Sequence, residues 1–423
     1  MVSAKKKLLI IYPNWVPSNA VGVFRVRLIV NYLQEYDWEP IVLAVNPKFY
    51  EEEQSQDLVK LVKNDIRVEF VDAKNASKIR LYGDIALRAF GNLKKRAIEI
   101  VNKEKIDCLW VPIPPFYTAL IARQVHDATN VPYVIDYIDP WVHDFPGSHF
   151  AFSRARLASI MASWLEPIAV KKAAGFTGVS SAYYLPVLER NKHLKKIPQS
   201  GMPYGFDAND YSAKPANDKL LWSNDGDVIP YIYAGAFLPN AHYFVDEMFK
   251  IIAAMRKSGK LNKKVRFYFA GTGHTNLKCI GDYAEEHCIQ DIVSEKKERI
   301  PYLEVLNNLS SAEGVLAIGS TEMHYTASKV FQAILSLRPV FAVFHHHSTV
   351  VDILKETIAD NYLVKYFEDE EEAEFESRLL RGFEFFLNQS NGWNPIIEKL
   401  DKYSASSSAA AVASVLNQAI KHE

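Results

Sequence analysis

One loop-to-helix junction carries the residue types of an anion-binding site. Gly319-Ser320-Thr321 follows an apolar, strand-like run, and Ala327-Ser328-Lys329-Val330-Phe331-Gln332 begins a helix-like segment. Backbone amides at a helix N-terminus, the hydroxyl of Ser328 and the ammonium of Lys329 would together attract a phosphate group. An ordinary serine-capped helix with a solvated lysine is the alternative.

Two further loops place glycine where a ligand could approach the main chain. Gly271 and Gly273 come directly after an apolar run, and Gly22 precedes the first helix-like segment. The dinucleotide-binding GxGxxG pattern is incomplete, because Asn276 stands at its third glycine position, so a dehydrogenase is disfavoured. A plain tight turn at 271–273 and a steric need for Gly22 remain open.

An acidic, aromatic loop is the third candidate. Asp136-Tyr137-Ile138-Asp139-Pro140-Trp141, followed by His143 and Asp144, comes after the apolar run Val131–Ile135. Open parallel sheets bind ligands beyond the carboxyl ends of their strands. Acids, a tryptophan and a histidine this close together are unusual in a connecting loop, although a structural loop is the alternative.

Three adjacent histidines, His345-His346-His347, are candidate metal ligands. Adjacent histidines in an extended segment point to alternate sides and rarely converge on one ion. We therefore expect neither a metal ion nor a cofactor.

Short apolar runs alternate with amphipathic, helix-like segments, a pattern typical of a parallel sheet covered on both faces. A polar stretch, Ser212–Asp227, interrupts the pattern before it restarts. The predicted strands are Lys7–Tyr12, Pro40–Val45, Ile66–Val71, Cys108–Val111, Val131–Ile135, Phe176–Val179, Val228–Ala234, Val265–Ala270, Gly314–Ile318 and Pro339–Phe344. The predicted helices include Phe24–Glu35, Ile85–Asn102, Tyr117–Thr129, Arg154–Lys172, Tyr243–Lys257, Tyr302–Leu309, Ala327–Leu337 and Ser404–Ile420.

Composition narrows the class of protein. The chain has 423 residues, 48% of them hydrophobic, and three cysteines without CxxC spacing, which favours two globular domains in a reducing compartment. A net charge of -1 argues against nucleic acid as a partner. The charge balance is +7 over residues 1–200 and -8 over the rest, which fits two domains with different tasks.

In this order, the segments resemble family 4 of the GT-B glycosyltransferases over almost the whole chain, closest to a bacterial branch with an Asp-Pro-Trp loop in its first domain. The matching segments are Tyr12-Pro13 with Gly22-Val23-Phe24-Arg25, Pro114-Pro115-Phe116, Asp139-Pro140-Trp141, Tyr204-Gly205-Phe206-Asp207, Tyr233-Ala234-Gly235, Gly271-Thr272-Gly273 and Ser328-Lys329-Val330-Phe331-Gln332.

The resemblance implies an α/β fold of two tandem Rossmann-like, doubly wound domains facing a cleft. Residues 1–205 would form the acceptor domain and 206–400 the nucleotide-sugar donor domain, and a helix within 401–423 could pack back on the first. The donor would be bound by Gly22, Gly235, Gly271, Gly273, His324, Ser328, Lys329 and Gln332. Lys329 would also stabilise the leaving diphosphate, and Asp139 or His143 would orient or deprotonate the acceptor hydroxyl.

Several positions depart from the family pattern. Ala236 and Ala241 stand where many members have the arginine and lysine that hold the diphosphate. Gln332 and His324 stand where many members have glutamates, of which the first binds the donor ribose. These departures leave a non-catalytic GT-B scaffold and a nucleotide-sugar epimerase of the same fold as alternatives.

We therefore expect a cytoplasmic glycosyltransferase that moves a sugar from a nucleotide-sugar donor to a glycan or lipid-linked acceptor. The resemblance implies a retaining, metal-independent reaction, and we expect a role in cell-surface polysaccharide synthesis. We also expect peripheral contact with the inner face of the membrane, because Lys94, Lys95 and Arg96 adjoin Leu87, Phe90 and Leu93. A solvated helix face is the alternative there.

Overall fold

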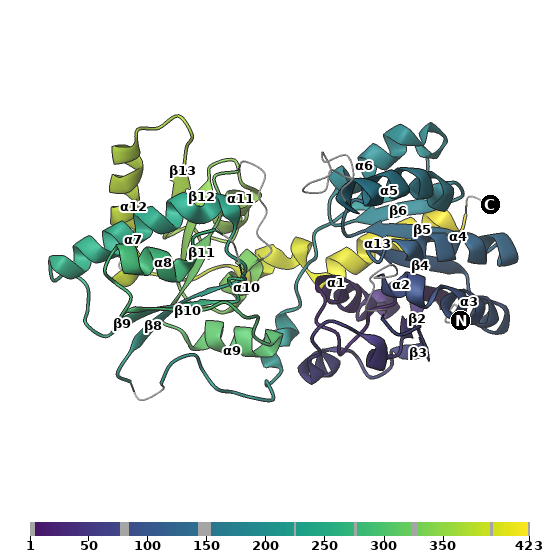
Figure 1. Cartoon of the computed structure of the whole chain (residues 1–423), viewed down its shortest axis with the longest axis horizontal. Coiled ribbons are helices and arrows are strands. Elements are labelled where there is room, and N and C mark those ends of the chain that lie inside the picture. The colour runs from purple at the N-terminus through teal and green to yellow at the C-terminus, as the bar shows by residue number, and fades with distance from the viewer. Residues whose placement is uncertain are drawn as a thin grey trace. The chain divides into compact units, whose positions relative to one another are not determined.

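The structure is a computed structural model that describes residues 5–76, 84–142, 154–223, 226–274, 277–322, 329–389 and 392–421, with only the backbone at 154 and 155. The chain forms two compact units. Unit 1 comprises Met1–Asp207 and Tyr403–Glu423, and unit 2 comprises Ala208–Lys402. Each unit has its own parallel sheet and its own helices (Figure 1).

Unit 1 contains a seven-stranded sheet in the order β3-β2-β1-β4-β5-β6-β7. Its strands pair in parallel, and the chain changes direction across the sheet between the neighbours β1 and β4. The strands are β1 (Lys6–Ile11), β2 (Trp38–Val45), β3 (Arg67–Val71), β4 (Cys108–Ile113), β5 (Tyr133–Tyr137), β6 (Gly175–Gly178) and β7 (Gln199–Gly201).

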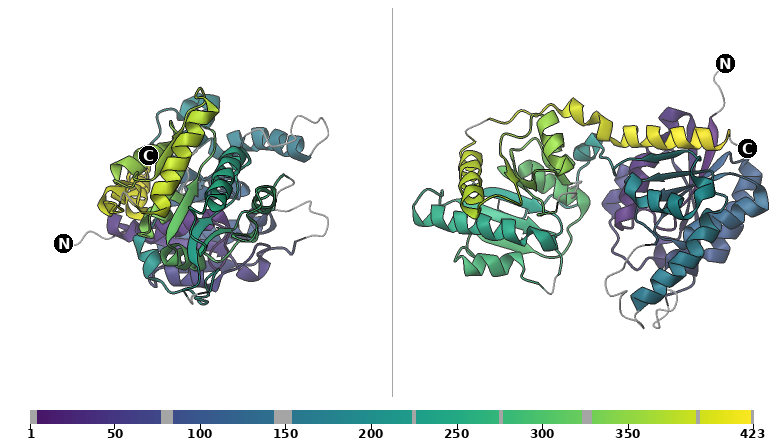
Figure 2. Two further views of the ribbon diagram at one scale, coloured as in Figure 1. Left: turned by 90° about the vertical axis from the view of Figure 1, so that its left-hand side faces the viewer. Right: turned by 90° about the horizontal axis from the view of Figure 1, so that it is seen from above.

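The α-helices of unit 1 are α1 (Val21–Val30), α2 (Ile85–Arg88), α3 (Phe90–Glu104), α4 (Tyr117–Thr129), α5 (Arg154–Val170), α6 (Ser181–Arg190) and α13 (Ala405–Ala419). Short 3-10 helices lie at η1 (Leu33–Tyr36), η2 (Pro47–Phe49), η3 (Gln56–Leu61) and η4 (Lys192–Leu194). Although α13 is far along the sequence, it packs against α1 and β6 (Figure 2). A Cβ atom on Gly175 of β6 would lie 2.9 Å from Val415 Cγ1, so this contact needs glycine.

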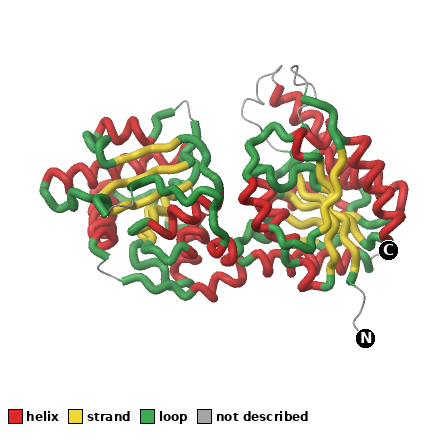
Figure 3. The backbone as a smooth tube through the Cα atoms, turned by 90° about the horizontal axis from the view of Figure 1, so that it is seen from below, coloured by secondary structure: helices red, strands yellow, loops and turns green. Residues whose placement is uncertain are grey.

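Unit 2 contains a six-stranded parallel sheet in the order β10-β9-β8-β11-β12-β13. Figure 3 draws the strands of both units in yellow. Its strands are β8 (Ile229–Ala234), β9 (Val265–Ala270), β10 (Val293–Lys296), β11 (Gly314–Ile318), β12 (Val340–His345) and β13 (Leu363–Tyr366). Its helices are α7 (His242–Lys257), α8 (Ile280–Glu286), α9 (Tyr302–Ser311), α10 (Lys329–Leu335), α11 (Thr349–Glu356) and α12 (Glu372–Leu387), with 3-10 turns η5 (Ala208–Ser212), η6 (Pro239–Ala241) and η7 (Ile397–Tyr403).

Each unit has the doubly wound arrangement expected from the sequence, and a helix near the end of the chain is present. Three strands were not predicted: β7, β10 and β13, which have three, four and four residues. These strands are too short and too exposed to give an apolar run. Among the described helices, none combines the length and the apolar character that crossing a bilayer requires.

Candidate functional site

Lys329 lies at the carboxyl edge of the unit 2 sheet, where β8 and β11 are neighbours and the strand order reverses. Its Nζ donates to Tyr233 Oη at 2.9 Å and to the carbonyl of Ala236 at 3.0 Å. Tyr233 Oη in turn donates to the same carbonyl at 2.7 Å. Since an ammonium has three donors, these contacts with the described residues leave one proton for a ligand. Open α/β sheets bind ligands at such a reversal point.

The environment of Lys329 changes its proton affinity. Burial lowers the pKa of the Lys329 ammonium to about 8. The centroid of the Tyr233 ring lies 4.8 Å from Nζ. A bound anion would offset the cost of burial, because an opposite charge favours the ammonium form.

Gly235 makes room for this lysine. A Cβ atom at position 235 would lie 2.4 Å from Lys329 Cε and 2.5 Å from its Nζ. The backbone of Gly235 also has a φ of 143°, which favours glycine. Gly235 therefore helps to fix the position of the Lys329 side chain.

Gly271 and Gly273 follow β9 with φ angles of 70° and 86°. Their amides do not offer free donors, because they donate to the carbonyls of Lys296 and Lys297 at 2.8 and 2.9 Å. A Cβ atom at either position would meet nothing within 4 Å. These glycines therefore do not form a cradle of N–H groups, and the space beside their α-carbons is open among the described residues.

Gln332 lies one helical turn after Lys329 on α10. Its Nε2 donates to Tyr302 Oη at 3.0 Å, and Tyr302 Oη donates to Asp210 at 3.0 Å. Its backbone carbonyl accepts the hydroxyl of Tyr211 at 2.6 Å. The remaining side-chain atom, Oε1, is buried and has no hydrogen-bond partner among the described residues. Gln332 therefore presents an acceptor that a ligand hydroxyl could satisfy.

Two donor-site predictions lie outside the described residues, namely Ser328 and His324. Ala236 and Ala241, which stand where many family members have cationic side chains, have other structural roles here. The carbonyl of Ala236 accepts from Lys329, and the side chain of Ala241 is completely buried in the core of unit 2.

In unit 1, Asp136 belongs to a buried ion pair. Arg25 Nε and Nη2 donate to its two carboxylate oxygens at 2.7 and 2.8 Å, and both side chains are 0% exposed. Thr177 Oγ1 also donates to Asp136 at 2.6 Å, and Trp110 Nε1 donates to Thr177 at 3.1 Å. Asp136 is therefore not available for acid–base chemistry, and it connects β5 to α1.

Asp139 is the exposed acid of the same loop, at the carboxyl edge of the sheet. Burial raises the pKa of Tyr204, and the nearby Asp139 carboxylate raises it further. The pKa of Tyr183 is raised by the same two causes. Asp139, Tyr183 and Tyr204 therefore form a polar group that the sequence did not indicate. His143, the other predicted acceptor-side residue, lies outside the described residues.

Trp141 supports this loop from within. Its ring stacks on Phe116, with centroids 5.6 Å apart and planes 7° from parallel, and the Trp141 side chain is 5% exposed. The acidic loop and the proline-aromatic loop after β4 are therefore packed together in unit 1.

Gly22, at the start of α1, has a steric role. A Cβ atom there would lie 2.2 Å from Tyr12 Oη and 3.3 Å from Ile138 Cδ1. Tyr12 is buried at the end of β1 and fills this space. The contact accounts for the glycine without a ligand, and donor binding by Gly22 stays a prediction.

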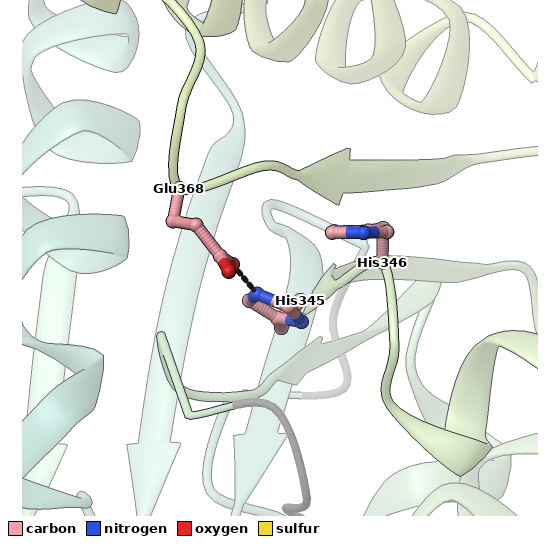
Figure 4. Close-up of side chains that lie close together, drawn as sticks. All are labelled: His345, His346 and Glu368. Atoms are coloured by element: carbon pink, nitrogen blue, oxygen red, sulfur yellow. Dashed lines mark hydrogen bonds and ion pairs between the residues drawn. The ribbon is translucent and has the colours of Figure 1, made fainter.

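His345, His346 and Glu368 come together at the ends of β12 and β13, with ligand atoms within 4.8 Å of one another (Figure 4). The expectation that neighbouring histidines diverge is wrong here, because β12 ends at His345. However, His345 Nδ1 accepts the amide of His347 at 3.1 Å, so its proton lies on Nε2 and is donated to Glu368. A metal ion bound at Nε2 of His345 would require the ring proton to lie on Nδ1, where it would point at the N–H of His347. This donor set therefore fits a hydrogen bond and does not fit a metal ion.

The expected membrane-contacting surface on α3 is wrong. Leu93 is 0% exposed within the core of unit 1, and Phe90 is partly buried against that core. Arg96 pairs with Glu69 at 2.9 Å and with Glu99 at 3.0 Å. This helix therefore offers no apolar outward face.

Solved structures with two such domains resemble this chain over nearly its full length. Anabaena HepE in complex with UDP and glucose has a TM-score of 0.56 at 13% identity, over 97% of this chain and 99% of that one. An Escherichia coli structure described as trehalose-6-phosphate bound with UDP-2-fluoro glucose has a TM-score of 0.60 at 10% identity, over 98% and 99%. A Listeria monocytogenes protein assigned as a UDP-N-acetylglucosamine 2-epimerase has a TM-score of 0.53 at 12% identity, over 96% and 94%. The chain therefore has the GT-B fold.

No protein-family model matches the sequence, and no curated protein matches it.

Proposed function

We propose that this protein is a nucleotide-sugar-dependent glycosyltransferase whose donor diphosphate is held by Lys329. The observation that carries the proposal is the placement of this partly buried ammonium at the strand-order reversal of unit 2, with one proton left for a ligand. The GT-B fold supports it, because solved structures of this fold hold UDP or a UDP sugar.

The proposed chemistry follows from charge development. As the glycosidic bond of the donor breaks, negative charge accumulates on the leaving diphosphate, and a preorganised cation lowers the barrier. Lys329 would supply this charge without a metal ion. Gln332 Oε1 would accept a ribose hydroxyl, and the open space beside Gly271 and Gly273 would admit the donor.

On the acceptor side, we assign Asp139 to orienting or deprotonating the acceptor hydroxyl, with Tyr183 and Tyr204 beside it. Retention of the anomeric configuration, a glycan or lipid-linked acceptor and a role in cell-surface polysaccharide synthesis complete the proposal. They rest on the family resemblance of the sequence.

The similarity to the Listeria protein favours one second candidate, a nucleotide-sugar epimerase. Calorimetry with UDP, followed by incubation with UDP-sugars, tests both enzymes. We expect UDP to bind and the donor to be hydrolysed slowly without an acceptor. Formation of an epimer under the same conditions would support the epimerase. Absence of binding by any nucleoside diphosphate would support a non-catalytic scaffold.

A further inference from the structure

Helix α5 has large apolar side chains on its exposed face. Its acid, Glu166, is 0% exposed and accepts Arg190 Nε at 3.1 Å and Nη2 at 2.5 Å. The exposed fractions of Leu157, Trp164 and Ile168 are 60%, 74% and 54%. A helix at the surface of a globular unit normally has the opposite arrangement.

The exposed side chains form one stripe. Leu157, Met161, Trp164 and Ile168 follow one another at intervals of four, three and four residues, and Ile160 is exposed beside them. This spacing places them on a single helix face. Isolated exposed apolar residues are ordinary, but a contiguous stripe marks an interaction surface.

Positive charge lies at both ends of the stripe. Arg156 is exposed near the start of α5, and Lys171 and Lys172 are exposed directly after its end. His193 Nε2 contacts the carbonyl of Lys171 at 3.3 Å, which brings the segment with the exposed Lys192, Lys195 and Lys196 to the same end. Two exposed acids also lie in these segments. Asp127 pairs with Lys172 and Arg123 at 3.1 and 3.0 Å, and Glu189 precedes Lys192 by three residues.

We propose that this face of α5 docks unit 1 on an anionic lipid bilayer, with the helix lying in the interface. An apolar stripe containing a tryptophan and bordered by basic residues suits the boundary between headgroups and acyl chains. The basic ends attract anionic headgroups. A second copy of the chain is a poorer occupant, because both ends of the stripe are basic and pairing it with itself, in either direction, would bring like charges together. The proposal does not depend on the donor site.

Flotation of the full chain with vesicles tests the proposal. We expect binding to vesicles of phosphatidylcholine and phosphatidylglycerol at low salt, weaker binding at high salt, and little binding to phosphatidylcholine alone. Trp164→Glu should reduce the bound fraction at least about tenfold, because it places a charge in the apolar stripe. The double variant Lys195→Gln/Lys196→Gln should weaken binding to anionic vesicles only. Phe385→Glu, at an exposed phenylalanine of unit 2, is the matched control and should bind like wild type.

Circular dichroism of each variant checks that the fold is retained. The proposal is overturned if the wild-type protein does not float with the anionic vesicles. It is also overturned if a folded Trp164→Glu variant floats like wild type. Sedimentation velocity tests whether the stripe instead mediates self-association. A wild-type dimer that Trp164→Glu converts to monomer would show that the stripe pairs with a second copy instead.

Discussion

Lys329 fills the space that a side chain at position 235 would need, since a Cβ atom there would lie 2.4 Å from Lys329 Cε. The two residues are 94 positions apart. Gly235 directly follows β8 and Lys329 begins α10, which comes after β11, and β8 and β11 are the neighbours at the strand-order reversal. The position of the ammonium therefore depends on the absence of a side chain at Gly235.

Gly235→Ala should consequently weaken nucleoside diphosphate binding even though Lys329 is still present. The added methyl group would displace the lysine from Tyr233 and from the Ala236 carbonyl. Gly259→Ala is the matched control, because Gly259 also has a positive φ, 72°, and a Cβ atom there would meet nothing within 4 Å. Calorimetry should show a loss for the first variant alone. Equal nucleoside diphosphate binding by both variants would contradict the placement of Lys329 in the donor site.

Lys329→Ala should lower turnover by ~10²–10³, the usual effect of removing one preorganised group that stabilises developing charge. It should also weaken diphosphate binding. Lys260→Ala removes an exposed lysine that pairs with Glu384 at 3.0 Å, and it should leave both quantities unchanged. The measurements are initial rates and calorimetry for the two variants beside wild type. A Lys329→Ala variant with wild-type kinetics would contradict the assignment.

Diphosphate binding should weaken as the pH rises above about 8. Burial lowers the pKa of Lys329 to about 8, so the free protein carries the ammonium below that pH and loses it above. Bound diphosphate stabilises the ammonium, so binding above pH 8 should take up a proton. Calorimetry in buffers of different ionisation enthalpy measures this uptake. Lys329→Arg should remove the pH dependence, because arginine stays charged. Proton uptake that persists in this variant would point to another group.

Asp139→Asn should reduce turnover while donor binding stays close to that of wild type. The substitution keeps the size of the side chain and removes the charge that would orient or deprotonate an acceptor hydroxyl, a contribution of ~10²–10⁴ in rate for general base catalysis. Asp127→Asn changes an exposed acid on α4 and serves as the control. Unchanged turnover in Asp139→Asn would leave the acceptor-side role without support.

Asp136→Ala should destabilise unit 1 by about 3–5 kcal/mol, because it leaves the guanidinium of Arg25 buried without its partner. Replacing both residues, as in Arg25→Met/Asp136→Leu, should recover a large part of this loss. As a comparison, Lys48→Ala removes one partner of an exposed ion pair, since Lys48 and Asp72 are each 57% exposed, and it should cost less than about 1 kcal/mol. Urea denaturation followed by near-ultraviolet circular dichroism measures the three changes. A double variant as unstable as the single one would mean that the pair contributes more than charge neutralisation.

The architecture was predictable because its signal is local. β9 and α4 begin and end where the apolar runs and the periodicity placed them, at Val265–Ala270 and Tyr117–Thr129. β10 was missed because its sequence, VSEK, alternates partly buried with exposed residues over four positions. Such an edge strand is stabilised by pairing with β9 rather than by an apolar run.

The candidate site was predictable in part. The sequence indicated Lys329 as an anion-binding residue, but its contact with Tyr233 joins residues 96 positions apart. In the same way, residue types alone placed Asp136 and Asp139 in one acidic loop, and only the family resemblance singled out Asp139. The buried partner Arg25, 111 positions away, separates their roles. Contacts of this kind depend on strand order, which a single sequence does not specify.

The position of α13 has a consequence for synthesis of the chain. Unit 1 is discontinuous, because residues 208–402 of unit 2 come between its two segments. A ribosome therefore releases all of unit 2 before Val412, Val415 and Leu416 become available to cover the sheet of unit 1. Until then the glycine at position 175 and its apolar surroundings stay open to solvent, and unit 2 can fold first. In a newly made chain, the unit whose synthesis begins first is thus the last to receive all of its elements.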